Sequence, residues 1–289
     1  MPDGRMRGTM AEQLVRGFVL IGTRLREEPT TASTLDRHSL SLPRGAYTTF
    51  RTYGGNQAFR LEEHLMRLTA SAALDGFPCT IDFLEVRAGI KEAVSLAGFA
   101  ESRVRLTLPY GALGDLYIAV APYTPLPARL YQEGVHCVTA PPDLKRNNPR
   151  SKGTTFIAPG SQARAGLAAS HEILLLSPQG EILEGSSSNF FAVLDHTLRT
   201  AEEGVLLGTT RNMAIAQADP LLPVVRKPVS LGELPRLQEA FLTSVSRGIL
   251  PVTRIDELPI GDGTPGRITI ELGRRLLAAI TAELEPIGP

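Results

Sequence analysis

The sequence predicts an α+β protein with two domains. Segments with strand-like alternation and segments with helical spacing follow one another without the regular order of a doubly wound parallel sheet. The chain has 289 residues, enough for one or two hydrophobic cores. A polar stretch rich in turn-forming residues, 141–155, interrupts these segments, and we expect the domain boundary there.

The first half of the chain contains both kinds of segment. Residues 1 to about 30 show neither pattern, so we expect a loosely held arm. Residues 44–53 alternate in strand fashion, and residues 60–77 carry apolar side chains at helical spacing. The other elements expected here are a helix at 81–98 and strands at 103–108, 115–122 and 134–140.

The second half is richer in strands. Residues 205–208 are apolar and are expected to end a strand, after which Gly-Thr-Thr begins a helix. Two further helices are expected, at about 160–171 and, amphipathic, at 267–284. The strands expected are 171–177, 181–185, 189–194, 238–244 and 251–255. The domains are then 1–140 and 153–289, joined by a linker at 141–152.

Composition narrows the class of protein. Basic and acidic residues number 30 each, so nothing indicates a nucleic-acid partner or an anionic membrane surface. No apolar run reaches the roughly 18 residues of a membrane helix, and the start of the chain lacks the cleavage site of a signal peptide. Cys79 and Cys137 stand far apart, which excludes a disulfide framework or a cysteine-rich zinc site. We therefore expect a cytoplasmic protein without a metal ion.

One stretch, EILEGSSSNFF at 181–191, places an acid and four small polar residues inside a strand-like region. The simplest interpretation is turn chemistry, because Gly, Ser and Asn form turns, with Glu184 facing water at a sheet edge. The alternative is a buried Glu184 that holds a cation, because a buried carboxylate without a partner is unfavourable. A pyridinium nitrogen is one such cation.

Two other stretches have the chemistry of a phosphate site. In LLGTTRN a glycine and two threonines begin a helix, where free N–H groups and the helix dipole bind anions, although a plain threonine cap is the alternative. Arg67 has a guanidinium that can clamp a phosphate, or it pairs with Glu63 on the helix surface. His64 beside them is expected to pack or cap rather than to bind a ligand.

A fourth stretch contains a candidate amine. Only four of the 30 basic residues are lysines. Lys152 follows turn-forming residues and precedes a helical segment, and a lysine can form a Schiff base with an aldehyde when burial or neighbouring cations lower its pKa. An exposed linker lysine is the alternative, and it fits Lys145 equally well.

Together these stretches resemble the class IV pyridoxal-phosphate enzymes, which include branched-chain aminotransferases, D-amino-acid aminotransferases and aminodeoxychorismate lyases. The resemblance extends from about residue 44 to 256, with the motifs in family order and the 32-residue interval from Lys152 to Glu184 typical of the family. The matching motifs are YTTFRTY, FRLEEHLMRLTASA, NPRSKGTTF, ILEGSSSNFF, VLLGTTRN and FLTSVSRGILPV.

The resemblance implies a role for each matching residue. Lys152 is implied to be the Schiff-base lysine and proton shuttle, and Glu184 the partner of the pyridine nitrogen. The other residues implied to bind the cofactor pyridoxal 5′-phosphate are Arg67, Ser188, Asn189, Gly208, Thr209, Thr210, Val245 and Ser246. Val245 stands where the family commonly has a threonine, so a backbone N–H or the adjacent Ser246 replaces that contact. Tyr47 and Arg105 are implied to line the substrate side.

The resemblance also implies the fold and the reaction. The fold is the two-domain fold-type IV, with a smaller N-terminal α/β domain, a linker that ends at Lys152 and a larger, mixed, barrel-like C-terminal domain. The reaction is ping-pong amino transfer between an amino acid and a 2-keto acid. The alternatives are a lyase of the aminodeoxychorismate type and a non-catalytic binding protein. The family is usually dimeric, with the loop near 109–114 reaching toward the partner's site, so we expect a homodimer.

The substrate is only partly indicated. D-amino-acid enzymes of the family usually carry an Arg-x-His pair on the loop that follows residues 103–114, and this chain has none there. We therefore expect an L-amino acid with an apolar side chain, with a primary amine as an open alternative. Arg105 is a candidate for the substrate carboxylate, or has a structural role if it lies on the other face of its strand.

Overall fold

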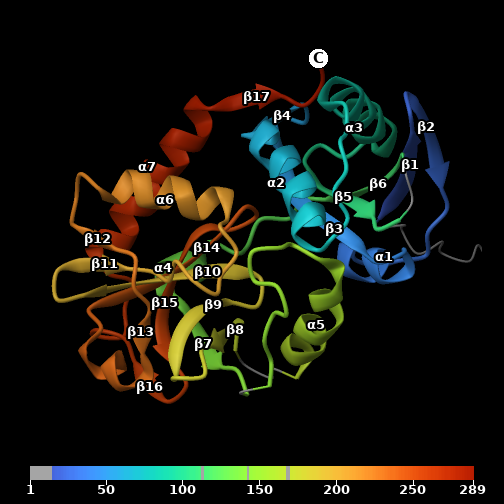
Figure 1. The fold of residues 1–289 in the computed structure, drawn as a ribbon. Helices are drawn as coiled ribbons and strands as arrows, with labels where there is room; N and C mark the ends of the chain where they lie inside the picture. The colour runs from blue at the N-terminus through green and yellow to red at the C-terminus, as the bar shows by residue number, and fades with distance from the viewer. Residues whose placement is uncertain (1–14, 112–113, 142, 167–169) are drawn as a thin grey trace, which may run out of the picture.

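The computed structural model describes residues 15–111, 114–141, 143–166 and 170–289. Two β-sheets divide the molecule, and each has its own layer of helices (Figure 1). Helices α2 and α3 cover the first sheet, and α6 and α7 cover the second. The helices are α1 (Leu35–Ser41), α2 (Leu61–Leu74), α3 (Phe83–Ala97), α4 (Arg129–Glu133), α5 (Ile157–Ala165), α6 (Thr209–Ala218) and α7 (Arg267–Ala282).

The first sheet has seven strands in the order β17-β4-β3-β5-β6-β1-β2, all antiparallel. The apolar stripe that the sequence places on α2 packs against it, together with α3. Asp82 begins α3 by accepting from two backbone N–H groups, and Gly98 ends it in the left-handed conformation. The strands are β1 (Arg16–Ile21), β2 (Arg24–Glu28), β3 (Gly45–Tyr53), β4 (Gln57–Phe59), β5 (Ser102–Pro109), β6 (Asp115–Pro122) and β17 (Leu284–Pro286).

The second sheet closes on itself. Its strands follow the order β12-β11-β10-β14-β15-β7-β8-β9-β13, and β9 also pairs with β10, which joins six strands into a barrel. The pairs β15–β7 and β7–β8 are parallel, so the sheet is mixed. Its strands are β7 (Val135–Thr139), β8 (Glu172–Leu176), β9 (Glu181–Gly185), β10 (Ser188–Leu194), β11 (Thr197–Arg199), β12 (Val224–Val225), β13 (Val229–Ser230), β14 (Glu239–Ser244), β15 (Gly248–Ile255) and β16 (Leu258–Pro259).

The apolar strand β10 shows how this barrel is packed on both faces. Phe190 points into the barrel core, whereas Phe191 packs on the outer face, beneath α6 and α7. Phe191 stacks on Phe241 of the neighbouring β14, with ring centroids 4.9 Å apart. This alternation explains why the sequence NFFAVL is continuously apolar. The α+β class and the barrel-like second sheet are confirmed.

Three expectations about individual elements are wrong. Part of the expected N-terminal arm forms β1 and β2, because β1 pairs with β6, about 100 residues later, and buries Phe18 and Leu20. Helix α5 occupies 157–165 instead of 160–171, since it follows directly from the 3-10 turn Thr154–Phe156. Residues 205–208 are not a strand but an extended loop that leads into α6. Residues 1–14 and 167–169 of these expectations lie outside the described residues.

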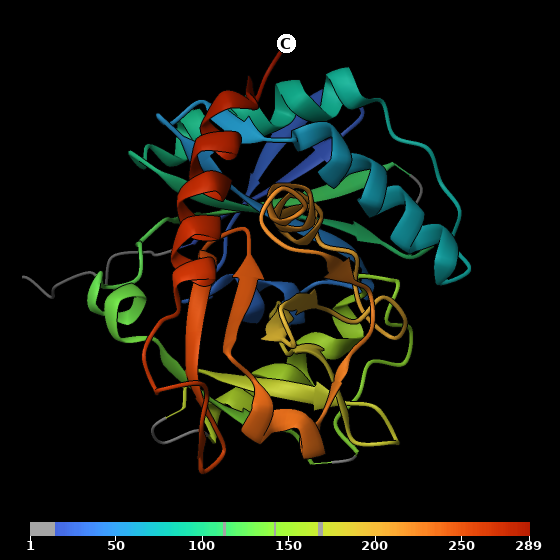
Figure 2. The ribbon, with the colours of Figure 1, turned by 90° about the vertical axis from the view of Figure 1, so that its left-hand side faces the viewer.

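Two strands, β7 and β17, pair with strands of the other predicted domain. Strand β7 precedes residue 140 but pairs with β15 and β8 of the barrel. Strand β17, at the end of the chain, pairs with β4 of the first sheet. Figure 2 shows α7 rising from the second sheet toward the first, where the chain ends. The division at residues 140 and 153 therefore stays a prediction, and strand pairing favours a boundary before β7.

The described residues contain neither a membrane-spanning helix nor a cluster of metal-binding side chains. Within residues 15–111, 114–141, 143–166 and 170–289, no helix has the length and apolarity to cross a bilayer. In the same ranges no group of three or more His, Cys, Asp or Glu residues is arranged to hold a metal ion.

Leu68→Ala is expected to lower the free energy of unfolding by about 2–5 kcal/mol, because truncating a fully buried leucine leaves a cavity. Leu68 lies on the buried face of α2 and has no exposed surface. Urea denaturation measures the change. The matched control Met66→Ala lies on the same helix, 56% exposed, and is expected to change stability by less than about 0.5 kcal/mol. Equal losses in both variants would contradict the described packing of α2.

Candidate active site

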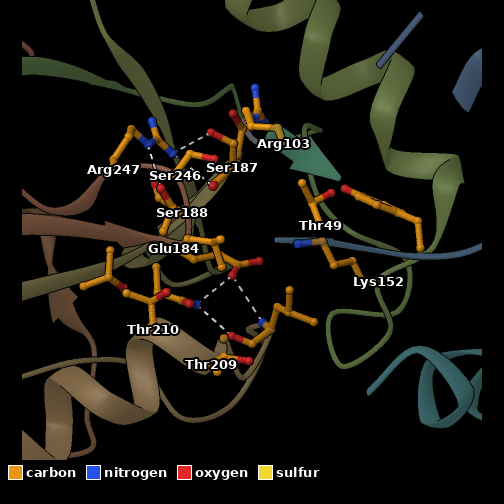
Figure 3. Close-up of a pocket in the computed structure, with 18 of the residues that line it drawn as sticks. Thr49, Arg103, Lys152, Glu184, Ser187, Ser188, Thr209, Thr210, Ser246 and Arg247 are labelled. Carbon is orange, nitrogen blue, oxygen red and sulfur yellow. Dashed lines mark hydrogen bonds between the residues drawn. The ribbon is translucent and has the colours of Figure 1, made fainter. Parts of the chain in front are cut away.

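A cavity of about 490 Å³ lies where the two sheets meet, and both contribute to its walls. Strands β3 and β5 and helix α2 supply one wall, and the β9–β10 and β14–β15 turns and the start of α6 supply the other (Figure 3). Every residue that the resemblance implies to bind cofactor or substrate lines this one cavity: Tyr47, Arg67, Arg105, Lys152, Glu184, Ser188, Asn189, Gly208, Thr209, Thr210, Val245 and Ser246.

Lys152 reaches the cavity from the polar segment between the domains. Its carbonyl oxygen accepts from the N–H of Tyr47 at 2.8 Å, and its own N–H donates to Ser71 Oγ at 3.1 Å. The Nζ atom lies 5.2 Å from the centroid of the Tyr47 ring. Burial, together with repulsion from Arg67, Arg146 and Arg105, holds the pKa of Lys152 well below its ordinary range. The side chain is therefore suited to present a neutral, nucleophilic amine.

Asp75, at the end of α2, braces the loop that carries this lysine. Its carboxylate accepts from Ser151 Oγ at 2.7 Å and from Asn148 Nδ2 at 2.8 Å. It also accepts from the hydroxyl of Tyr110, whose ring stacks on Phe77. The adjacent loop at 109–114 was expected to reach a partner subunit, and its residues 112–113 lie outside the described residues. Sequence reasoning missed Asp75, which looks like an ordinary end of a helix.

Glu184 is buried, with 2% of its surface exposed, and does not face water. Its Oε1 accepts from Arg146 Nε at 2.7 Å, and its Oε2 accepts from Asn189 Nδ2 at 3.1 Å and from the N–H of Leu206 at 3.2 Å. Burial raises the pKa of Glu184, and Arg146 opposes that rise. The need for a cation near a buried carboxylate was the signal that would have found Arg146, which sequence reasoning left unnamed.

The three serines of EGSSSN bind a second buried acid, Glu172, rather than solvent. Ser186 and Ser187 donate to its two carboxylate oxygens at 2.6 Å each, and Ser188 donates at 3.1 Å. Glu172 is fully buried at the start of β8. A Cβ at Gly185 would lie 2.2 Å from Ser188 Oγ and 2.9 Å from Glu172 Cγ, so this position requires glycine. Glu172, which sequence reasoning missed, thus holds the serine turn in place through these hydrogen bonds.

Arg247 completes this cluster from the turn between β14 and β15. Its guanidinium lies 3.3 Å from Glu172 Oε2 and donates to the carbonyl and hydroxyl oxygens of Ser187 at 3.0 and 2.9 Å. The carboxylate of Glu172 therefore binds both the serine turn and the β14–β15 turn, and both turns line the cavity.

The opposite end of the cavity is suited to bind an anion (Figure 3). Thr209 and Thr210 are buried there at the first turn of α6, where backbone N–H groups are free of helical partners. Gly208 precedes them, and a Cβ on it would lie 2.5 Å from Asn189 Oδ1. The glycine thus lets the start of the helix approach the Asn189–Glu184 pair.

Arg67 lines the same cavity from α2. It donates to Thr48 Oγ1 at 3.0 Å and to His64 Nδ1 at 3.2 Å. It is not paired with Glu63, which instead binds Arg60 at 3.0 Å. Burial lowers the pKa of Arg67 to about 10, and its Nε has no hydrogen-bond partner in the described part of the chain. His64 is fully buried against Thr48 and Phe50, as expected of a packing histidine.

Val245 and Ser246 lie in the β14–β15 turn at the cavity wall. Two residues earlier, Thr243 also lines the cavity, and its buried hydroxyl has no hydrogen-bond partner within the described ranges. A threonine hydroxyl without a partner in the described chain therefore lies two residues before position 245, where the resemblance predicts a threonine. Its position in the run FLTS was the available signal.

Arg105 faces the cavity and is almost fully buried. It forms an ion pair with Asp36 of α1 at 2.8 Å and donates to Thr49 and Ser39 at 3.0 and 3.1 Å. Its guanidinium carbon lies 4.7 Å from the centre of the Tyr47 ring. Asp36 also binds Arg164 of α5 at 3.2 Å. Sequence reasoning missed Asp36, because it assigned no element to residues 31–43.

The arrangement favours chemistry at an amine. A buried lysine, a buried carboxylate and an anion-binding end share one cavity whose walls carry an excess of arginine. Such a site can hold a phosphate at one end and bind a carbonyl compound covalently at Lys152. Glu184 can hold a second, cationic group between them.

Comparisons with known proteins agree with this geometry. The family model described as amino-transferase class IV matches residues 45–255. D-alanine aminotransferase of Bacillus licheniformis is 29% identical over 92% of this chain and 98% of its own length. A probable branched-chain-amino-acid aminotransferase of Thermotoga maritima is 30% identical over 80% and 85% of the two chains. The crystal structure of a putative branched-chain amino acid aminotransferase from Thermotoga maritima has a TM-score of 0.74 at 26% identity, covering 92% and 96%.

Glu172→Gln is expected to lower the free energy of unfolding by about 3–5 kcal/mol at neutral pH, because it removes the fully buried carboxylate that pairs with the partly buried Arg247. Burial alone would raise the pKa of Glu172, but Arg247 and the serine hydroxyls bring it below the ordinary 4.5. The stabilisation is therefore complete above pH 4.5 and is lost as the pH falls through the lower folded-state pKa.

Urea denaturation between neutral pH and pH 3 measures this difference. The difference in the free energy of unfolding between the wild-type protein and Glu172→Gln should become smaller as the pH falls below 4.5. The control Glu203→Gln removes an ion pair in which the glutamate side chain is 89% exposed, and should change stability by less than about 1 kcal/mol. A gap that stays constant with pH would show that the charge of Glu172 has no part in it.

Proposed function

The chain belongs to the class IV aminotransferase family, and from that premise we propose that it transfers an amino group from an amino acid to a 2-keto acid, with pyridoxal 5′-phosphate as cofactor. The observation that carries the proposal is the placement of Lys152 and Glu184 in one cavity, with the start of α6 at its end. A neutral-prone amine and a buried carboxylate are the two groups that this chemistry requires.

The residues present fit the cofactor. Arg67 Nε and Thr243 Oγ1 are buried in the cavity wall with no partner in the described chain, so both have unused capacity to donate to an anion. Lys152 would hold the aldehyde carbon, and Glu184 the ring nitrogen. The residues that would hold the phosphate are Arg67, Gly208, Thr209, Thr210 and Thr243, whereas Ser246 lies at the other end of the cavity, beside Arg247.

Pyridoxal 5′-phosphate, when bound, supplies an aldehyde that captures amines and a ring that withdraws electrons from the substrate's α-carbon. Lys152 must then exchange its own amine for that of the substrate, which requires the neutral form that burial and neighbouring arginines favour. The freed Nζ would take the α-proton of the substrate and return it to the carbon that the aldehyde of the cofactor supplies. Glu184 stabilises positive charge on the ring nitrogen, and Asn189 and Leu206 keep its carboxylate in place.

We further propose that the amino donor is an L-amino acid with an apolar side chain. The absence of an Arg-x-His pair after β5 supports this, as do relatives named branched-chain aminotransferases, although a D-alanine enzyme is comparably similar. Apolar side chains occur along the cavity wall: Tyr47, Leu126, Phe156, Ile157, Leu206 and Val245. We propose a homodimer only because proteins of this family are usually dimeric.

Lys152→Ala is expected to abolish covalent attachment of the cofactor and to reduce amino transfer by at least about 10²–10⁴-fold, because both the anchoring amine and the proton carrier are lost. Borohydride reduction followed by intact-protein mass measurement reports the attachment independently of turnover. The matched control Lys145→Ala removes a lysine from the same polar segment and should retain the added mass. A reduced adduct that persists in Lys152→Ala would refute the assignment.

Turnover with paired donors tests the reaction and its stereochemistry. L-leucine and D-leucine, each with pyruvate or 2-oxoglutarate, are expected to give product only when a keto acid is present, with at least about tenfold preference for the L form. Initial rates should give the parallel double-reciprocal lines of a ping-pong mechanism. Pyruvate release from aminodeoxychorismate without any keto acid would instead favour the lyase. A preference for D-leucine would overturn the proposed stereochemistry.

A further inference from the structure

The cavity contains more cationic side chains than its carboxylates can neutralise. Seven cations from the described chain line it, and four of them form ion pairs with acids. Asp36 pairs with both Arg105 and Arg164, Glu184 pairs with Arg146, and Glu172 pairs with Arg247. The cations left without a carboxylate in the described residues are Arg67, Arg103 and Lys152.

Two of these three have a use in the proposed function. Lys152 is the amine, and Arg67 lies on α2 with an unpaired Nε and a capacity for phosphate. Arg103, on β5, has no such use. No hydrogen bond, ion pair or ring contact joins its guanidinium to any described residue, and its Nε is buried without a partner. Figure 3 shows Arg103 beside Ser187, Ser246 and Arg247, at the end of the cavity away from Thr209 and Thr210.

Arg103 is partly buried, and an unpaired guanidinium with a buried Nε is unfavourable unless an anion pairs with it. Its nearest charged neighbours include Arg105 and Arg247, which repel it, and Asp36, which is already shared between two arginines. Arg105, in contrast, is already paired: its Nη1 contacts Asp36 and Ser39 and its Nε donates to Thr49, which leaves only its Nη2 for a new partner. A carboxylate entering this end of the cavity would therefore meet one guanidinium that is free to bind it.

We propose that Arg103, rather than Arg105, binds the carboxylate of the amino- and keto-acid substrates. The inference rests on the proposed function and adds the residue that distinguishes acids from simple amines. In this arrangement the planar guanidinium of Arg103 donates hydrogen bonds to the carboxylate, and Asp36 keeps Arg105 and Arg164 paired as part of the wall. Arg105 is then a positioning residue that supports Tyr47 and α1.

Binding of 4-methylpentanoate to the cofactor-loaded protein tests this, because the probe has a carboxylate and no amine and cannot react. Arg103→Met is expected to raise its Kd by about 10–100-fold, the effect of losing a charge-assisted hydrogen bond, as measured by titration calorimetry. Arg103→Lys keeps the positive charge but loses the planar guanidinium. Its Kd for 4-methylpentanoate should lie between those of the wild-type protein and Arg103→Met. The neutral isostere 4-methylpentanamide should bind wild-type and Arg103→Met protein equally.

Two controls sharpen the outcome. Arg24→Met removes an exposed arginine of β2 and should leave both affinities unchanged. Arg105→Lys keeps a cation beside Asp36, and if it weakens 4-methylpentanoate binding more than Arg103→Met does, the assignment is overturned. Unchanged affinity in Arg103→Met overturns it as well. The borohydride mass measurement on each variant shows separately whether Lys152 holds the cofactor, so a failure of the proposed function is recognised independently.

Discussion

The burial of opposite charges in one small volume is the constraint on which the rest of this structure depends. Glu184 and Lys152 share a cavity, and each would be unfavourable there alone. Arg146, Asn189 and the N–H of Leu206 satisfy the carboxylate, while burial and nearby arginines move the lysine toward its neutral form. The same surroundings that stabilise the acid therefore make the amine reactive.

Other buried or partly buried acids support the residues that face the cavity. Asp75 holds the loop before Lys152, Asp36 holds Arg105 and Arg164, and Glu172 holds the serine turn and Arg247. Each acid joins elements that are distant in the sequence: Asp36 connects α1 to α5, and Asp75 connects the end of α2 to the segment that carries Lys152. Together these acids order a cation-rich wall. Most of its arginines are paired with acids, so few cations are left to bind substrates and cofactor.

The residues with local signals could be predicted from the sequence. Glu184 stands out because it interrupts a strand-like run, Gly208–Thr210 because they begin a helix, and Lys152 because lysines are scarce. Glu172, Asp36 and Asp75 had no such signal, and Arg146 was indicated only as the unspecified cation that a buried Glu184 needs. Each is an ordinary charged residue until tertiary structure brings its partner to it. For Glu172 and Arg247 that partner is 75 residues away. The strands β1 and β2 were missed for the same reason, since their stability comes from pairing with β6.

The return of the chain end to the first sheet has a mechanical consequence. The polypeptide crosses from one sheet to the other after β6 and crosses back through α7 into β17, so the halves are tethered at two separate places. Two separate connections define a line about which the sheets can rotate relative to each other, and they oppose relative movement in other directions. The second connection includes the sixteen-residue helix α7. A movement that widens the cavity between the sheets is therefore a rotation about that line.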